Sequence, residues 1–412
     1  MFDRLISDPS FREVFSDVFR TIWKVLPVWL PIVLLVTFVQ TWLRYVRTKW
    51  NSEQKYVLLE LKVPKEVEKS PAAMEIVITA MHQVSTGNLI DVYFKGRTRP
   101  WFSLEMVSIG GQVHFFIWTP VKFRSIVETQ IYSQYPAVEI HESSDYSLGV
   151  LYNPAEISMW GAQMALSKVD AYPIKSYIDY GLDKDPKEEY KIDPLTAVIE
   201  YLGSIKPGEQ AWIQILIQAH KSEGLKELRL LKRSDWTKAA KEEIKKIISE
   251  AVFKPGEGKD ITSTNLTDTQ KQTITAIERS ISKFPFDAAI RLVYIAKKDI
   301  YNSTNVPGIL GSFKQFGSNN LNGFKRAWPT DFDYPWQDFR GTRKRANERK
   351  MLDAYKRRSF FHPPYRNFHT KRFILTTEEL ATIFHFPGLV SSTPTFSRLV
   401  SKKAEPPPNL PV

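Results

Sequence analysis

The sequence predicts an α+β protein with one membrane-spanning helix, two βαββαβ units and an extended basic C-terminal region. Three observations predict it: an apolar run without charges near the N-terminus, two successive sets of apolar strands and amphipathic helices, and many lysines and arginines after residue 340. We expect five segments: an amphipathic segment (1–24), a transmembrane helix (25–43), a first unit (55–145), a second unit (150–316) with inserted helices (236–283), and a basic, aromatic and proline-rich region (317–412).

The apolar run is long enough to span a membrane. Residues 25–43 would extend roughly 28 Å as a helix, close to a hydrocarbon core of about 30 Å. Tryptophan and tyrosine near its ends are typical of an aromatic belt. A buried core helix is the alternative. A cleavable signal peptide fits poorly, because charged residues rather than a small-residue cleavage site follow the run.

The charges beside this run predict its orientation. Arg44, Arg47 and Lys49 follow it, with no acid before Glu53, whereas acids and bases balance in residues 1–24. The excess of positive charge predicts that the C-terminal body lies in the cytoplasm. We therefore expect a single-pass protein of the cell inner (cytoplasmic) membrane. The absence of cysteine fits a reducing compartment and excludes disulfides and thiolate metal sites.

The first unit has the element order of a ferredoxin-like fold. Strands are expected at residues 56–63, 101–109, 112–119 and 137–142, and the two central strands are joined by the Gly110-Gly111 turn. Helices begin at Ser70-Pro71 and Thr119-Pro120, where a hydroxyl residue precedes a proline. The resulting order, βαββαβ, is that of a ferredoxin-like sandwich. Residues 90–94 are expected to add an edge strand.

The second unit repeats this order with an interruption. We expect strands at residues 157–166, 211–219 and 288–296, with 372–375 as the closing strand. A helix follows Asp193-Pro194, and a shorter helix covers 307–316. Two polar amphipathic helices, 236–251 and 267–283, interrupt the unit between its second and third strands. They predict a helical hairpin inserted into a second ferredoxin-like unit.

The C-terminal region concentrates the positive charge of the chain. Residues 340–372 contain twelve lysines and arginines but only two acids, Glu348 and Asp353. This region therefore carries most of the net charge of +12 of the whole chain. Aromatic residues lie among them: Tyr355, Phe360, Phe361, Tyr365 and Phe368. Basic side chains interleaved with rings are typical of single-stranded nucleic-acid binding. The candidate nucleic-acid-binding residues are Arg340, Arg343, Lys344, Arg345, Arg349, Lys350, Lys356, Arg357, Arg358, Arg366, Lys371 and Arg372.

Two other interpretations of this basic region stay open. It could contact acidic lipid or protein, or its arginines could lie on a solvated surface or pair with acids elsewhere while its rings pack. The remainder of residues 317–412 is expected to be mostly extended, apart from a short helix at 378–384 begun by a capping box at Thr376–Glu379. Its proline-rich end is typical of a linker.

The sequence predicts no catalytic residues, no metal site and no cofactor. Gly258-Lys259 is followed by Asp260, and Phe253 stands where a phosphate-binding loop needs its first glycine. The seven histidines have no metal-binding spacing, and no serine lies in a nucleophile-elbow motif. Glu378 and Glu379 are adjacent and point apart on a helix, so they are better explained by capping than by acid–base catalysis.

Several segments resemble the non-motor, N-terminal region of membrane-anchored coupling proteins of type IV secretion and conjugative DNA transfer. They are residues 65–75 (KEVEKSPAAME), 100–105 (PWFSLE), 111–117 (GQVHFFI), 312–324 (SFKQFGSNNLNGF), 375–387 (LTTEELATIFHFP), 393–395 (TPT) and 402–407 (KKAEPP). In such proteins the last stretch precedes a P-loop motor domain, and this chain ends there. The resemblance therefore implies no ATPase activity and a separately encoded motor ATPase as partner.

These observations together predict a membrane anchor and docking platform rather than an enzyme. The expected partners are the membrane, the motor ATPase, DNA and further copies of the chain. The alternative is an assembly platform of a type IV pilus-like machine, although residues 44–55 are too few for the coiled coil common in such subunits. An enzyme of unrecognised type is a third hypothesis, disfavoured by the lack of catalytic motifs in the sequence.

Overall fold

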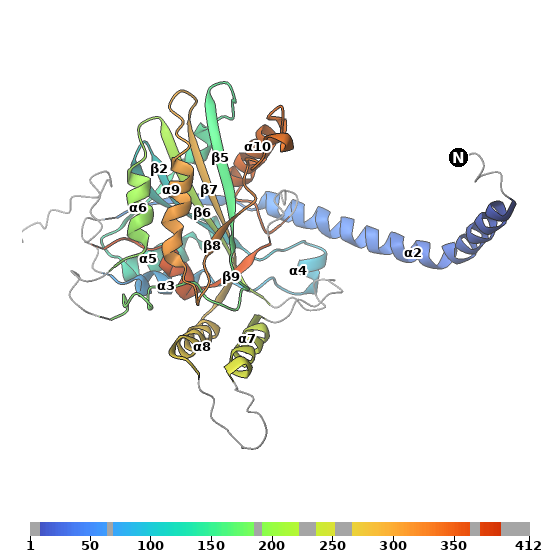
Figure 1. Ribbon diagram of the computed structural model, residues 1–412, viewed down its shortest axis with the longest axis horizontal. Helices are drawn as coiled ribbons and strands as arrows, with labels where there is room; N and C mark the ends of the chain where they lie inside the picture. The colour runs from blue at the N-terminus through green and yellow to red at the C-terminus, as the bar shows by residue number, and fades with distance from the viewer. Residues whose placement is uncertain are drawn as a thin grey trace, which may run out of the picture. The chain divides into compact units, whose positions relative to one another are not determined.

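The coarse α+β prediction is confirmed: an N-terminal apolar helix accompanies a nine-stranded antiparallel sheet. The computed structural model describes residues 9–63, 69–184, 192–221, 236–251, 266–362 and 371–388. Within them the chain forms two compact units (Figure 1). One contains helices α2 (Pro9–Glu53) and α4 (Leu89–Tyr93), and the other contains the sheet with the remaining helices.

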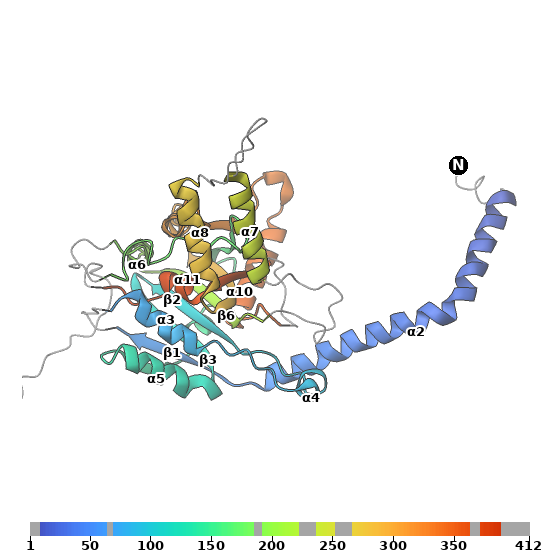
Figure 2. The same ribbon diagram turned by 90° about the horizontal axis from the view of Figure 1, so that it is seen from below.

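Helix α2 contains the predicted transmembrane helix (25–43) and extends beyond it at both ends. Its stretch Trp29–Glu53 is long and apolar enough to cross a membrane, and most of that stretch is exposed. Pro27 and Pro31 lie inside the helix. Because proline has no N–H, each leaves a carbonyl of the preceding turn without its donor, and the ribbon bends in this N-terminal half (Figure 2).

The sheet is continuous across both predicted units. Its order is β4 (Glu139–Ser143), β1 (Tyr56–Lys62), β3 (Gln112–Pro120), β2 (Trp101–Ile109), β6 (Glu209–Ala219), β7 (Pro285–Lys297), β5 (Ile157–Leu166) and β8 (Phe324–Ala327), while β9 (Phe373–Thr376) pairs with β7. The antiparallel β2–β6 pair, with Leu104 opposite Ile215, joins the two halves. Both partner strands are mostly buried, as central strands covered on two faces must be, and their polar residues, among them Glu105 and Gln214, are buried with them.

Helices cover both faces of the sheet. The larger core lies under α3 (Pro71–Ala80), α5 (Arg124–Gln134), α6 (Leu195–Gly203), α9 (Asn305–Ser312) and α11 (Thr377–Ile383). Helix α10 (Thr342–Lys356) packs against the other face around Trp212 and Met351. Neighbouring residues such as Leu58 and Leu59 belong to different cores, because successive side chains of a strand point to opposite faces.

Several local predictions are confirmed. Gly110 and Gly111 have φ of 61° and 91° in the β2–β3 turn, a conformation that only glycine adopts easily. The capping box joins Thr376 and Glu379 at the start of α11. The two helices expected at 236–251 and 267–283 are observed as α7 (Trp236–Ala251) and α8 (Asp268–Ile281), between β6 and β7 in the chain. Short 3₁₀ turns lie at Val121–Phe123, Tyr146–Gly149, Phe313–Phe316 and Pro335–Gln337.

Three predictions about local structure were wrong. Residues 90–94 do not form a strand, because Asn88 and Asp91 form a capping box that begins α4. The strand near 372–375, observed as β9, pairs with β7, while β8 takes the place beside β5. The region after residue 317 was expected to be mostly extended, but it contains helix α10, because Met351, Leu352 and Tyr355 recur at helical spacing and are buried. The proline-rich C-terminal end lies outside the described residues.

Candidate nucleic-acid interface

Half of the twelve candidate residues are exposed on helix α10 or immediately before it. Helix α10 buries Met351, Leu352 and Tyr355 against the sheet and turns its other face outward. The exposed cations of the helix and of the residues immediately before it are Arg340, Arg343, Lys344, Arg345, Arg349 and Lys350. The carboxylate among them, Glu348, is 6% exposed and accepts a hydrogen bond from the Tyr152 hydroxyl at 2.7 Å. The cations therefore dominate the accessible charge of this face.

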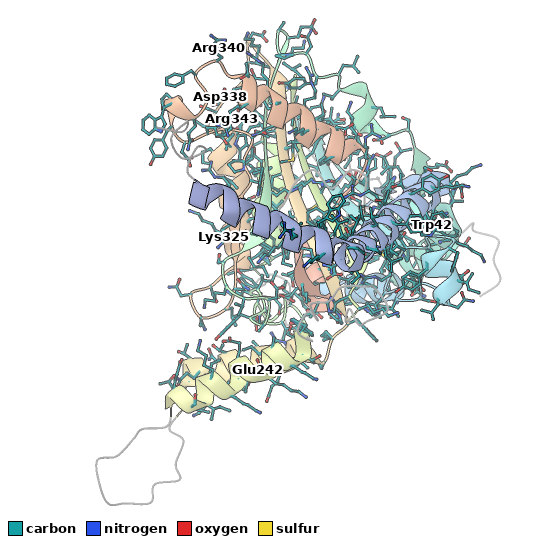
Figure 3. The ribbon with its side chains drawn as sticks, turned by 90° about the vertical axis from the view of Figure 1, so that its right-hand side faces the viewer. Trp42, Glu242, Lys325, Asp338, Arg340 and Arg343 are labelled. Atoms are coloured by element: carbon teal, nitrogen blue, oxygen red, sulfur yellow. The ribbon has the colours of Figure 1, made fainter. Side chains whose placement is uncertain are left out.

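The start of α10 is fixed by Asp338. Its two carboxylate oxygens accept the backbone N–H of Arg343 at 3.2 Å and of Lys344 at 2.7 Å. Burial alone would raise the pKa of Asp338, but these amide hydrogen bonds outweigh it and lower the pKa. Gly341, with φ of 63°, turns the chain into the helix. Figure 3 shows Asp338, Arg340 and Arg343 grouped at this end.

Exposed aromatic rings precede the cations in the chain. They are Trp328, Tyr334, Trp336 and Phe339. Phe339 is 85% exposed and Trp336 is 64% exposed, which is unusual for such large apolar side chains. The Tyr334 and Trp336 rings stack with their centroids 4.6 Å apart. We call these four rings and the six cations the α10 surface.

Sequence reasoning named other rings and missed these four. The available signal was the run of residues 332–339, FDYPWQDF, in which rings alternate with proline and acids without a helical or strand period. Of the rings that were named, Tyr355 and Phe360 are buried and Phe361 is half-buried. Tyr365 and Phe368 lie outside the described residues.

The remaining candidate cations do not belong to the α10 surface. Arg357 is exposed and pairs with Asp353 at 2.8 Å. Lys356 donates to the Val150 carbonyl oxygen at 2.5 Å. Arg372 pairs with the buried Asp287 at 3.2 Å, and Lys371 is exposed. Arg366 lies outside the described residues.

Arg358 differs most from its prediction, because it is buried beneath the end of α10. Its Nε donates to Glu105 Oε1 at 3.0 Å and its Nη2 to Glu105 Oε2 at 3.1 Å, while Nη1 and Nη2 both contact Asp145. Burial alone would raise the pKa of Glu105, but the charge and hydrogen bonds of Arg358 lower it. Arg358 therefore holds the helix end in place and cannot reach a ligand at the surface.

Further buried polar groups extend this attachment of α10. The Tyr146 hydroxyl donates to Glu105 at 2.8 Å and lies 2.7 Å from the Tyr355 hydroxyl. Gln214 donates to Glu105 at 3.0 Å and to the Tyr355 carbonyl oxygen at 3.1 Å. The Arg291 guanidinium contacts the Ala354 carbonyl oxygen at 2.9 Å, and burial lowers its pKa to about 9. These contacts fix the helix that carries the exposed cations.

Helix α10 approaches the sheet closely at Gly161. A Cβ atom on Gly161 in β5 would lie 2.9 Å from Met351 Cγ, closer than such atoms pack. The neighbouring segment is fixed to the same strand, since Thr330 donates its N–H to the Gly161 carbonyl oxygen at 2.8 Å. Helix α10 and the segment around Thr330 are therefore both in contact with β5.

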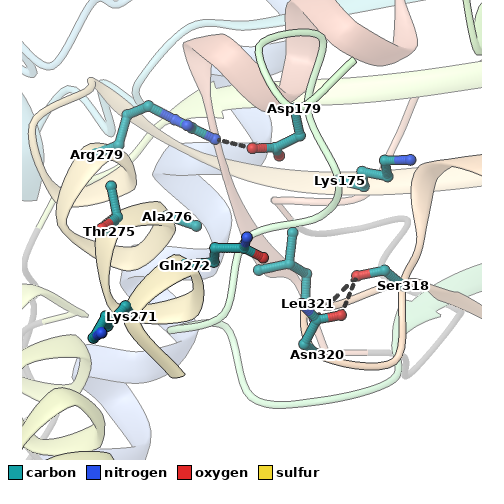
Figure 4. Close-up of a pocket in the computed structure, with 10 residues that line it drawn as sticks. All are labelled: Lys175, Asp179, Lys271, Gln272, Thr275, Ala276, Arg279, Ser318, Asn320 and Leu321. Atoms are coloured by element: carbon teal, nitrogen blue, oxygen red, sulfur yellow. Dashed lines mark hydrogen bonds and ion pairs between the residues drawn. The ribbon is translucent and has the colours of Figure 1, made fainter. Parts of the chain in front are cut away.

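A second polar site is a cavity of about 600 Å³ beside α8 (Figure 4). Lys175, Lys271 and Arg279 are the cations among its lining residues. Arg279 already pairs with Asp179 at 2.7 Å and with Glu378 at 2.9 Å, and Lys271 pairs with Asp268. Among the described residues no cluster of histidine and acidic side chains could hold a metal ion. The α10 surface is consequently the better site for a polyanion.

Comparison with known families places most of the chain in one family. A model described as "Domain of unknown function (DUF8128)" matches residues 46–398. The match covers the sheet, its helices and the α10 surface. No curated protein matched the chain.

Proposed function

The chain belongs to the DUF8128 family, and we propose that it is a single-pass membrane subunit of a type IV secretion or conjugation-like DNA-transfer apparatus. In this role α2 anchors the protein, and the α10 surface binds single-stranded DNA that passes to a motor ATPase. The observation that carries the proposal is that six exposed cations on α10 and immediately before it follow four exposed rings in the chain. Cations follow a phosphate backbone, and rings stack on bases without regard to sequence.

The α2 helix and its flanks support the membrane location. Its apolar stretch is long enough for a bilayer and mostly exposed, whereas a core helix of a soluble protein would be buried. Arg44, Arg47 and Lys49 follow the most apolar part. They support an inner-membrane protein with its body in the cytoplasm, where a motor ATPase and DNA would meet it.

The strand order supports the finer fold proposal of two ferredoxin-like units. The first half of the sheet has the order β4-β1-β3-β2, and the second half repeats it as β8-β5-β7-β6. In each half a helix follows the first strand and another follows the third: α3 and α5, then α6 and α9. We propose that these units serve as the docking platform for the motor ATPase and for further copies of the chain.

The experiment is a salt titration of single-stranded DNA binding. The full chain in detergent is titrated with a fluorescent oligonucleotide at a series of salt concentrations. Replacing Arg343, Lys344 and Arg345 with glutamine should reduce the slope of log affinity against log salt by about 2, at roughly 0.7 per lost phosphate contact. A matched control replaces Lys241, Lys245 and Lys246 on α7, which are also exposed, and should leave the slope unchanged.

The rings provide an independent test of the same surface. Phe339→Ala removes a side chain that contributes little to packing, since it is 85% exposed. If a base stacks on this ring, affinity should fall by about 1–3 kcal/mol with the salt slope unchanged. If the variant with Arg343, Lys344 and Arg345 replaced keeps its salt slope, and Phe339→Ala keeps full affinity, the α10 surface does not bind DNA. That outcome would favour a protein-only platform of the pilus type.

A further inference from the structure

The short helix α4 is attached to the end of α2 that carries the tryptophan and tyrosine rings. Trp42 Nε1 donates to the Tyr93 carbonyl oxygen at 2.9 Å, and the Thr98 hydroxyl donates to Asn51 Oδ1 at 2.7 Å. Tyr93 is the last residue of α4 and Thr98 lies shortly before β2, so the two bonds attach both ends of the segment 93–98 to α2. Figure 2 shows α4 beside this part of α2.

The attachment is also a close backbone contact. Gly96 has φ of +69°, and a Cβ atom there would lie 2.3 Å from the carbonyl carbon and oxygen of Val46. Any larger residue would push the segment away from α2. The position of α4 along α2 is therefore set at three places, by Trp42, Val46 and Asn51.

Helix α4 exposes apolar side chains although it has a well-formed start. Asn88 and Asp91 make a reciprocal capping box, with bonds of 3.2 and 2.9 Å. Ile90 is nevertheless 59% exposed and Phe94 68% exposed, and Leu89 is exposed as well. Three large apolar side chains on five helical residues and their C-cap form a contiguous apolar patch, which usually marks an interaction site.

The chemistry around the patch is that of a lipid interface. On α2, Phe38, Trp42 and Tyr45 are exposed at the same end, as expected where a spanning helix meets the headgroups. Lys95 and Arg97 follow the patch, and Arg44, Arg47 and Lys49 lie on the adjoining part of α2. Apolar and aromatic side chains flanked by cations are typical of segments that lie in the surface of an anionic bilayer.

We propose that α4 lies in the interface of the membrane that α2 crosses, with Leu89, Ile90 and Phe94 in the lipid. This contact sets where α2 leaves the bilayer, because α4 is bound to α2 near Trp42. It also gives the protein a second point of membrane contact, which limits rotation about a single anchor. The inference rests on the membrane anchor of the proposed function but is independent of DNA binding.

The test uses the absence of cysteine from the chain. Single cysteines replace Ile90, Phe94, Val36 in α2, or Leu151, an exposed apolar residue of the body. Each is labelled with a nitroxide in the full chain, reconstituted in nanodiscs of phosphatidylcholine and phosphatidylglycerol. Collision with oxygen, which concentrates in lipid, is compared with collision with a water-soluble nickel chelate. All four side chains are exposed, so the labels disturb no core contact.

The expected result is an oxygen-to-nickel ratio several-fold higher at 90, 94 and 36 than at 151. If 36 has the high ratio while 90 and 94 resemble 151, the α4 proposal is wrong and the anchor stands. A label at 90 or 94 that is shielded from both reagents would mean protein contact, and would also overturn the proposal. A low ratio at 36 would reject the anchor and the α4 inference together.

Discussion

Two adjacent arginines at the end of α10 differ in burial, so their replacement should have very different effects on stability. Arg358 is 1% exposed and bridges Glu105 and Asp145, whereas the Arg357 side chain is 46% exposed and pairs with Asp353 four residues earlier. Removing one partner of a buried ion pair leaves an uncompensated charge and costs about 3–5 kcal/mol. An exposed pair at this helical spacing contributes about 0.3–0.5 kcal/mol.

Arg358→Gln should therefore lower the free energy of unfolding roughly tenfold more than Arg357→Gln. At roughly 2–4 °C per kcal/mol for a domain of this size, the melting temperature should fall by about 6–20 °C in Arg358→Gln and by no more than about 2 °C in Arg357→Gln. Thermal unfolding followed by circular dichroism, in the same detergent for both variants, measures the difference.

A double-mutant cycle separates the ion pair from general loss of packing. Combining Arg358→Gln with Glu105→Gln removes the cation and its main buried partner, so the loss should be smaller than the sum of the two single losses. Equal stability of Arg358→Gln and Arg357→Gln, within about 1 kcal/mol, would refute the assignment of Arg358 to the attachment of α10. Additive losses would refute the coupling between Arg358 and Glu105.

Two further predictions concern the same helix. Gly161→Ala places a Cβ atom 2.9 Å from Met351 Cγ and should destabilise the body by about 1–3 kcal/mol. Gly149→Ala is the control, because a Cβ atom there meets no atom within 4 Å, and it should leave the stability unchanged. The denaturation midpoints of the two variants measure the difference. Arg358 lowers the pKa of both Glu105 and Asp145, although burial opposes the shift, so their contribution to stability is present above their ordinary pKa values and is lost as pH falls through the lowered ones. The protein should lose stability below about pH 4.5, and Arg358→Gln should flatten this dependence in acid unfolding titrations.

Local signals in the sequence predicted the local structure well. The Gly110-Gly111 turn and the capping box at Thr376 depend on a few neighbouring residues, and both are present. Residues 90–94 show the limit of this reasoning. Their apolar, β-branched composition favours a strand, but two hydrogen bonds between Asn88 and Asp91 begin a helix instead.

Pairings between distant strands could not be predicted in the same way. Nothing near residue 373 distinguishes pairing with β7 from pairing with β5, because both partner strands are long and apolar. The join between β2 and β6 also depends on contacts between residues more than 100 positions apart. Such choices are made by packing of the whole sheet, which a single strand's composition does not encode.

The difference between Arg357 and Arg358 has a specific backbone cause. Arg357 is the C-cap of α10, and Arg358 follows it with φ of 47°, a left-handed conformation that is uncommon for residues other than glycine. This turn directs the side chain back under the helix toward Glu105. A count of basic residues treats the two arginines as equivalent, and the helical period gives no information beyond the last turn.

The positive charge of the α10 surface depends on how the nearby acids are paired, not only on how many basic residues the region contains. The acids near α10 are already engaged: Glu105 and Asp145 with Arg358, Glu348 with Tyr152, Asp353 with Arg357, and Asp338 with backbone amides. Most of these carboxylates are buried or lie at the helix start, Asp353 is half-exposed beside Arg357, and the cations between residues 340 and 350 stay exposed. Breaking the buried pair would therefore do more than destabilise the helix. It would release two acids beneath the surface that is proposed to attract DNA.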